Sequence, residues 1–265
     1  MTSLRALGID LGSTTAKIVG VDAGGEIAWH CLEPAAPRPE EQVERLLALA
    51  LVAAADASGL PLVATGYGRH LVHVAQRKVT EITCHARGIF REVAHGGTLV
   101  DLGGQDSKVI VLGDRGEVID FSMNDKCAAG TGRFLENTAS RLGVPLEQMG
   151  PLSLASRDEV PISSTCTVFA ESEVISLLAR GVAIEAILCG LHRALVRRVV
   201  ALIRAVGLTP PLMLSGGVAH NQAVRALLEE ETGEPVTLPR QPELTGAYGA
   251  ALIALDMAAA PAHAP

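Results

Sequence analysis

Three short segments combine glycine with hydroxyl or acidic residues, and each follows an apolar run typical of a buried strand. Residues 10–15 read DLGSTT, residues 101–106 read DLGGQD, and residues 215–218 read SGGV. Glycine lets backbone N–H groups approach an anion without a Cβ atom in the way, and concave turns of this kind bind phosphate. An ordinary tight turn explains one such segment, but three of them favour a phosphate-binding site.

Side chains in these segments add groups suited to phosphate chemistry. The hydroxyls of Ser13, Thr14 and Thr15 are further hydrogen-bond donors. Asp10 and Asp101 occupy matching positions, and two facing carboxylates suit a hydrated Mg²⁺ ion held between phosphates. The P-loop pattern GxxxxGK[ST] does not occur in the sequence, so the site belongs to another class of phosphate-binding protein.

The elements that must position these segments occur twice. Both sets follow the order strand, acidic residue, glycine, polar turn, strand, hairpin and strand, and they begin about 90 residues apart. We therefore predict an α/β fold of two similar lobes. The expected strands are 4–12, 16–22, 26–31, 97–104, 107–112, 117–121, 212–217 and 235–238. Helical spacing of apolar residues is expected at 43–54, 134–142, 173–179, 185–206, 222–231 and 246–259.

Composition and charge narrow the class of protein further. The chain has 265 residues, of which 48% are hydrophobic and 19% charged, which indicates one or two globular domains. The net charge is −7 without a long basic run, so we expect no nucleic-acid partner. The longest apolar run spans residues 46–55, whereas a membrane helix needs about 20 residues. No leader pattern follows Met1, and we expect a cytoplasmic protein without membrane contact.

The five cysteines lack the close spacing of a metal knuckle or a disulfide framework. In a cytoplasmic chain they are thiols, metal ligands or core residues. Cys127 and Cys166 lie in segments rich in glycine or hydroxyl residues just before predicted helices, where the helix dipole stabilises a thiolate. From spacing alone, two buried core cysteines remain the simpler alternative. We expect Cys189 in the core and Cys31 at the end of a strand, while Cys84 stays open.

Taken together, the glycine segments resemble those of the actin, sugar-kinase and heat-shock-chaperone ATPase superfamily. The resemblance implies two duplicated actin-like (ribonuclease-H-like) lobes with a nucleotide cleft between them. The N-terminal lobe would span 1–94 and the C-terminal lobe 95–265, with the last helix free to pack back on the first lobe. The matching segments are 10–17 and 100–107 for the two phosphate loops, 214–218 for the adenosine segment and 246–251 for the second connecting helix.

This resemblance implies roles for individual residues. Gln105 would position water or a phosphate oxygen near the γ-phosphate, although capping of a turn is the simpler alternative. Asp10 and Asp101 join it as predicted catalytic residues and as Mg²⁺ ligands. Lys17 is equally consistent with a solvated strand residue. The full set of expected nucleotide contacts is Gly12, Ser13, Thr14, Thr15, Ala16, Lys17, Gly103, Gly104, Gln105, Gly216, Gly217, Asn221 and Gln241, the last two amides on the purine or ribose side.

Three longer motifs resemble one family, the activators of 2-hydroxyacyl-CoA dehydratases within the BadF/BadG/BcrA/BcrD-type ATPases. Residues 100–108 read VDLGGQDSK, residues 124–132 read NDKCAAGTG and residues 164–173 read STCTVFAESE. The resemblance implies a homodimer in which Cys127 and Cys166 of each subunit hold one shared [4Fe-4S] cluster. It also implies ATP/ADP with Mg²⁺, reduced ferredoxin or flavodoxin as electron donor, and a dehydratase component as transient partner. Electron transfer would be coupled to ATP hydrolysis.

Three alternatives remain open from the sequence. The chain resembles the ATP-binding subunits of benzoyl-CoA reductase, which would make it a permanent subunit of a larger complex. A sugar kinase of the same fold, such as an N-acetylglucosamine-kinase-like enzyme, would need a carboxylate base and no cluster. A non-redox clamp related to the chaperones would need a substrate-binding domain, which we do not expect after the last lobe helix.

Overall fold

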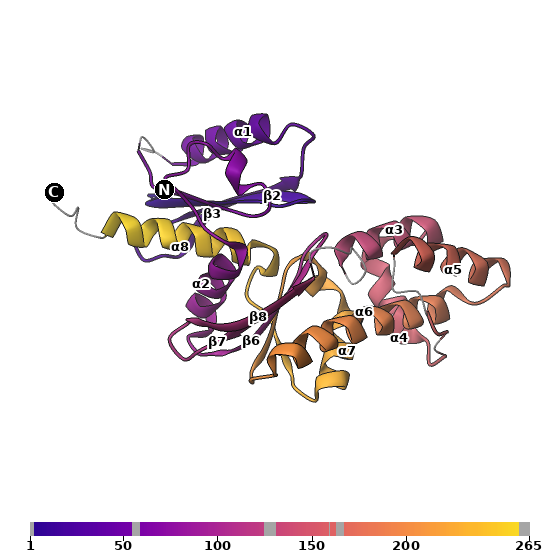
Figure 1. Cartoon of the computed structure of the whole chain (residues 1–265). Coiled ribbons are helices and arrows are strands. Elements are labelled where there is room, and N and C mark those ends of the chain that lie inside the picture. Colours follow the sequence, from indigo (N-terminus) through magenta and orange to yellow (C-terminus); the bar gives the residue numbers. More distant parts are fainter. Residues whose placement is uncertain (1–2, 55–58, 125–130, 159, 163–166, 260–265) are drawn as a thin grey trace. The chain divides into compact units, whose positions relative to one another are not determined.

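The computed structural model describes residues 3–54, 59–124, 131–158, 160–162 and 167–259 (Figure 1). The chain divides into two compact units. Unit 1 comprises Met1–His95, Arg115–Val118 and Glu243–Pro265, and unit 2 comprises Gly96–Asp114 and Ile119–Pro242. Within the described residues, no helix has the length and apolar character needed to cross a membrane.

Unit 1 is built on a mixed five-stranded sheet in the order β3-β2-β1-β4-β5. The strands are β1 (Ala6–Leu11), β2 (Thr15–Val21), β3 (Ile27–Pro34), β4 (Leu62–Thr65) and β5 (Arg77–Lys78). β1, β2 and β3 form an antiparallel meander, whereas β4 and β5 run parallel to β1. The helices are α1 (Pro39–Ala53), α2 (Glu81–Val93) and α8 (Thr245–Ala259), with short 3₁₀ turns η1 (Arg69–Leu71) and η4 (Pro242–Leu244).

The first sheet is covered on both faces (Figure 1). Ile9 and Ile18 pack toward α1 in one apolar cluster, and Val19 and Val63 pack toward α8 in another. The α8 side is unusually close, because a Cβ atom at Gly8 of β1 would overlap backbone atoms of α8. Aromatic residues make up only 3% of the sequence, and small residues let the strand and the helix pack closely in this core.

Unit 2 repeats the plan with a sheet in the order β10-β9-β6-β7-β8. Its strands are β6 (Gly97–Leu102), β7 (Ser107–Leu112), β8 (Val118–Asn124), β9 (Leu212–Ser215) and β10 (Val236–Thr237). A single large apolar cluster joins this sheet to its helices. These are α3 (Gly132–Leu142), α4 (Met149–Ala155), α5 (Thr167–Ala179), α6 (Ile184–Val206) and α7 (Gln222–Thr232), with 3₁₀ turns η2 (Leu146–Gln148) and η3 (Gly217–His220).

Strand register makes the duplication explicit. In unit 1, Asp10 pairs with Lys17 of β2 on one side and with Thr65 of β4 on the other. In unit 2, Asp101 is flanked in the same way by one residue of β7 and one of β9, namely Lys108 and Ser215. The predicted α/β class with two repeated lobes is thus confirmed.

Several boundaries differ from the sequence-based expectation. The helix expected at 43–54 begins at Pro39, since proline suits the first turn of a helix. Cys31 lies inside β3 rather than at its end, because the strand continues to Pro34. Four elements, β4, β5, α2 and α4, have no counterpart among the predicted strands and helices. The closing helix α8 packs on β1 and α2 and belongs to unit 1, in line with the packing back on the first lobe that the sequence analysis allowed, and unit 2 ends at Pro242.

Candidate functional site

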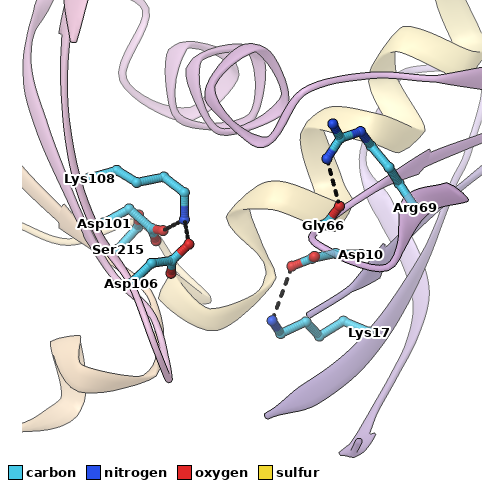
Figure 2. A network of polar contacts seen from close by, with 8 residues as sticks. All are labelled: Asp10, Lys17, Gly66, Arg69, Asp101, Asp106, Lys108 and Ser215. Atoms are coloured by element: carbon cyan, nitrogen blue, oxygen red, sulfur yellow. Dashed lines mark hydrogen bonds and ion pairs between the residues drawn. The ribbon is translucent and has the colours of Figure 1, made fainter. Parts of the chain in front are cut away.

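The first group of polar residues lies at the carboxyl end of β1 (Figure 2). Asp10 is buried, and Lys17, which faces it on β2, places its Nζ atom 3.0 Å from Asp10 Oδ2. The Lys17 side chain retains 15% exposure. The alternative of a merely solvated strand lysine is therefore wrong. The pair fixes a carboxylate and an ammonium group beside the first glycine turn.

The turn after β1 is closed by a hydrogen bond from the backbone N–H of Gly12 to the carbonyl of Thr15, at 3.1 Å. Ser13 and Thr14 are half-buried in this turn. Ala16 is fully buried and belongs to the apolar cluster under α1. Of the residues predicted here, Ser13 and Thr14 thus keep partly accessible side chains, while the Ala16 side chain is committed to the core.

Gly66, which was not predicted from the sequence, borders the Asp10 carboxylate and completes the first group of residues. Gly66 follows β4 with φ +91°, and a Cβ atom there would collide with Asp10 Oδ1 and the Leu11 carbonyl. Only glycine accepts this conformation and this contact at no cost. The Nη1 atom of Arg69 donates to the Gly66 carbonyl at 3.1 Å. Figure 2 shows Asp10, Lys17, Gly66 and Arg69 together.

The second group repeats this arrangement at the carboxyl end of β6 with deeper burial (Figure 2). The Ser215 hydroxyl donates to Asp101 Oδ1 at 2.9 Å. Lys108 Nζ lies 3.5 Å from Asp101 Oδ2 and 2.7 Å from Asp106 Oδ2. The side chains of Asp101 and Lys108 are each only 3% exposed. Neither Lys108 nor the role of Ser215 was predicted, although the seven-residue spacing from aspartate to lysine is common to both repeats.

The second glycine turn is tied to a helix. The Gly103 N–H donates to the Asp106 carbonyl at 3.0 Å and so closes the turn. The carbonyls of Gly103 and Gly104 in turn accept hydrogen bonds from the N–H groups of Gly132 and Arg133, at 2.9 and 2.8 Å. These are the first two residues of α3. Gln105 is exposed at the tip of the turn, so its side chain is accessible to a ligand.

The third glycine segment leads from β9 into η3. Gly216 has φ +85°, and its N–H donates to the Pro242 carbonyl at 2.9 Å. A Cβ atom added to Gly217 would meet no other atom within 4 Å, which leaves open space beside this turn. Gln241, a predicted purine-side residue, has a buried Oε1 atom without a hydrogen-bond partner among the described residues. A polar ligand atom would satisfy such a group.

Asn221 is occupied by protein groups. Its Oδ1 atom accepts from the N–H groups of Ala223 and Val224 at 3.0 and 3.2 Å and thereby caps α7. Its Nδ2 atom lies 2.9 Å from Nε2 of His192, whose Nδ1 atom lies 2.8 Å from the Leu188 carbonyl. Burial lowers the pKa of His192 to about 4, so the ring is neutral near pH 7. A direct contact between Asn221 and a nucleotide stays a prediction.

The two predicted cluster cysteines, Cys127 and Cys166, lie outside the described residues. The other three are inside. Burial raises the pKa of Cys84 to about 12, Cys189 is buried on α6, and Cys31 is half-buried in β3. Burial also raises the pKa of Cys31, so neither Cys84 nor Cys31 lies in an environment that favours the thiolate. No group of three or more His, Cys, Asp or Glu side chains suited to a metal ion occurs in the described part of the chain.

These features define a two-lobed α/β protein with a glycine turn and a carboxylate–lysine pair at the end of each central strand, as expected for an actin-like ATPase. A solved structure described as the activator of the 2-hydroxyisocaproyl-CoA dehydratase from Clostridium difficile with bound ADPNP matches with a TM-score of 0.87 and 39% identity, covering 96% of this chain and 95% of that one.

Sequence comparison agrees with the structural match. The 2-hydroxyisocaproyl-CoA dehydratase activator of Clostridioides difficile is 40% identical over 258 residues, covering 96% of both proteins. The (R)-2-hydroxyglutaryl-CoA dehydratase activating ATPase of Acidaminococcus fermentans is 41% identical over 261 residues, covering 97% of this chain and 99% of the relative. The family model described as BadF/BadG/BcrA/BcrD ATPase family matches residues 7–254. The chain belongs to this ATPase family.

Proposed function

We propose that this protein is an ATP-dependent one-electron donor that activates a 2-hydroxyacyl-CoA dehydratase. In this proposal a homodimer holds one [4Fe-4S] cluster, and ATP hydrolysis is coupled to electron transfer. The observation that carries the proposal is the pair of hydrogen bonds from Gly132 and Arg133 to the second glycine turn. They connect a phosphate-binding turn to the helix that follows Cys127 by five residues.

The nucleotide part of the proposal rests on the two carboxylate–lysine groups. Backbone N–H groups of glycine turns and the hydroxyls of Ser13 and Thr14 suit phosphate oxygens. Asp10 and Asp101 would hold a Mg²⁺ ion through its water ligands, because each carboxylate already contacts a lysine. Gln105, exposed at the tip of its turn, would orient the water that attacks the terminal phosphate.

The cluster part rests on the sequence around the two cysteines. A [4Fe-4S] cluster supplies reversible one-electron storage and takes four thiolate ligands. Cys127 and Cys166 provide two per chain, and a two-fold dimer provides four. α5 begins at Thr167, directly after Cys166, and a helix N-terminus stabilises negative charge. The pKa of Cys84 is raised to about 12, which leaves that thiol protonated and unsuited to the ligand role.

The coupling part follows from the turn between β6 and β7. The Gly103 N–H donates within the turn to the Asp106 carbonyl, and the carbonyls of Gly103 and Gly104 accept hydrogen bonds from the start of α3. A change in the turn on exchange of ATP for ADP therefore changes the hydrogen bonds at the start of α3. Such helix movements are a common output of nucleotide-dependent switches. Reduced ferredoxin or flavodoxin would supply the electron, a dehydratase component would receive it, and the cytoplasm would keep the thiols reduced.

The test is anaerobic purification of the wild type and of Cys127→Ala and Cys166→Ala. We expect brown, dimeric wild-type protein with iron and sulfide, and colourless variants that still bind ADP with unchanged affinity. Cys31→Ala is the matched control, because Cys31 is half-buried in β3, and it should keep its iron. An intact iron–sulfur spectrum in either cysteine variant contradicts the ligand assignment. Colourless wild-type protein that phosphorylates a sugar would favour a sugar kinase. Partner chains that always copurify with the protein would favour a subunit of a benzoyl-CoA-reductase-like complex.

Coupling is tested by Gly132→Pro. Proline is accepted at the first position of a helix but lacks the N–H that Gly132 donates to Gly103. We expect the variant to bind nucleotide and to retain its cluster, while the change in the cluster's electron paramagnetic resonance signal on addition of ATP is lost. An ATP response equal to that of the wild type would contradict the proposed route.

A further inference from the structure

Arg69 occupies a distinctive position in the first lobe. It is the first residue of η1, and its Nη1 atom donates to the carbonyl of Gly66 at 3.1 Å. Gly66 in turn lies against the carboxylate of Asp10. Since β1 and β4 are parallel neighbours, the turns that follow them meet at one edge of the sheet. The Arg69 guanidinium is thus tethered to the turn that borders the Asp10–Lys17 pair (Figure 2).

The charge of Arg69 has no carboxylate partner among the described residues, within 4.0 Å, although its side chain is half-buried. A guanidinium carries five N–H donors, and the Gly66 carbonyl uses one of them. Asp10 already contacts Lys17. Asp10 raises and Arg69 lowers the pKa of Cys84, which places both charges near that thiol. Asp10, Lys17 and Arg69 together carry a formal charge of +1, and the carboxylate of Glu81 also acts on the Cys84 thiol.

The second lobe shows that the turn itself does not need this arginine. Gly216 repeats the conformation of Gly66, with φ +85° against +91°, and it borders Asp101 in the same way. The residue three positions after Gly216 is Ala219, which is fully buried. The same glycine turn therefore forms with an uncharged residue at that position, and the charge of Arg69 is available for a ligand.

We propose that Arg69 binds the terminal phosphate of the nucleoside triphosphate and so makes the site discriminate ATP from ADP. The inference rests on the proposed function, because it presumes a nucleotide at the first glycine turn. A planar guanidinium suits two phosphate oxygens at once, and an arginine supplied to a terminal phosphate stabilises the charge that develops during hydrolysis. The alternative is that Arg69 only pins the Gly66 carbonyl.

The experiment compares Arg69→Gln and Arg69→Lys with the wild type by calorimetric titration with ADPNP and with ADP. We expect the Kd of ADPNP to rise on the order of tenfold in Arg69→Gln, as for loss of one charge-assisted hydrogen bond. The Kd of ADP should change less than about twofold. Arg69→Lys keeps the positive charge but lacks the planar guanidinium, so its Kd for ADPNP should lie between those of the wild type and Arg69→Gln. Arg77→Gln is the matched control, because it removes a charge from exposed β5 without touching the turn.

Two results would overturn the inference alone, provided that the wild type binds both nucleotides. Equal weakening of ADP and ADPNP would mean that Arg69 only holds the turn, and unchanged affinity for both would mean that it contacts neither. Wild-type protein that binds neither nucleotide would overturn the proposed function as well. If Arg69→Gln is poorly folded by its melting temperature, Arg69→Lys decides, since it must weaken ADPNP more than ADP.

Discussion

At the end of β1, Asp10 faces Lys17 in a setting where the lysine side chain keeps 15% exposure, whereas at the end of β6 Asp101 faces Lys108 with both side chains 3% exposed. The second lysine also contacts Asp106, and the matching position in the first lobe is Thr15. The glycine turn after the neighbouring strand carries Arg69 in the first lobe and a buried alanine in the second.

This difference gives the two groups of side chains opposite formal charge. Asp10, Lys17 and Arg69 sum to +1, while Asp101, Asp106 and Lys108 sum to −1. The first arrangement suits an anion and the second suits a cation such as hydrated Mg²⁺. A duplicated backbone has thus kept its strand register and its glycine turns, while a few side chains have given each copy a different affinity for charge.

The largest expected effect comes from the two lysines. Lys108→Met leaves the buried carboxylate of Asp101 and the partly exposed carboxylate of Asp106 without their cation, and we expect a loss of about 3–5 kcal/mol in the free energy of unfolding. Lys17→Met should cost about 1–2 kcal/mol, because its pair is more exposed and involves one carboxylate. Urea denaturation of both variants measures the difference. Equal losses would contradict the distinction between the two lobes.

A pH titration probes the second lobe next, because Asn221, the N-cap of α7, lies against the neutral ring of His192. Its pKa is lowered from 6.5 to about 4 by burial, so the unfolded chain takes up the proton first as the pH falls. Stability should therefore decrease between pH 6.5 and 4, by about 3 kcal/mol from this group. His192→Gln, which retains a hydrogen-bond acceptor for Asn221, should lack this component. Parallel acid profiles for the two proteins would refute the assignment.

Gly66→Ala and Gly216→Ala test the similarity of the lobes. Both glycines have positive φ, and in both a Cβ atom would collide with a backbone carbonyl; it would also collide with Asp10 at Gly66 and press tightly on Asp101 at Gly216. We expect each to lose about 2–3 kcal/mol, from strain and collision together. Gly233→Ala isolates the strain, because that glycine has φ +73° with open space around it, and it should lose only about 1 kcal/mol. A tolerated substitution at either turn would show that the two turns are not equivalent.

The smallest contrast concerns the two hydroxyls beside the aspartates. Ser215→Ala removes a buried hydrogen bond to Asp101 and should cost about 1–1.5 kcal/mol. Thr65→Val should stay within about 0.5 kcal/mol of the wild type, because in the described part of the chain Thr65 Oγ1 has no oxygen or nitrogen partner and interacts only with the Cys84 thiol, a weak hydrogen-bonding group. Thermal melts suffice for both measurements, and a larger loss at Thr65 than at Ser215 would reverse the comparison.

The sequence predicted the elements that repeat and the residues that lie inside the repeats. Asp10, Asp101 and the glycine turns were found because the same pattern occurs twice. Lys108 was missed because its pairing with Asp101 depends on strand register, although the matching spacing from Asp10 to Lys17 was present as a signal. Arg69 and Gly66 were missed because β4 spans only four residues, too few for a periodic pattern.

Other differences arise from tertiary contacts that no local pattern contains. The sequence predicted Asn221 as a ligand-binding amide, which stays a prediction; its role as the cap of α7 and its proximity to His192, 29 residues away, were not foreseen. α2 was not predicted, although Thr80 and Glu81 provide a typical N-terminal signal. Its packing on α8 depends on Gly88 and Gly249, where the two helices approach too closely for side chains.

The return of α8 to unit 1 has a consequence for biosynthesis. β1 leaves the ribosome early, but α8, which packs against Gly8 of β1, is translated only after the whole of unit 2. Nascent chains of multidomain proteins usually mature from the N-terminal side. In this protein all segments of unit 2 are synthesised before unit 1 is complete. Unit 1 cannot finish folding until translation has passed residue 259, where α8 ends.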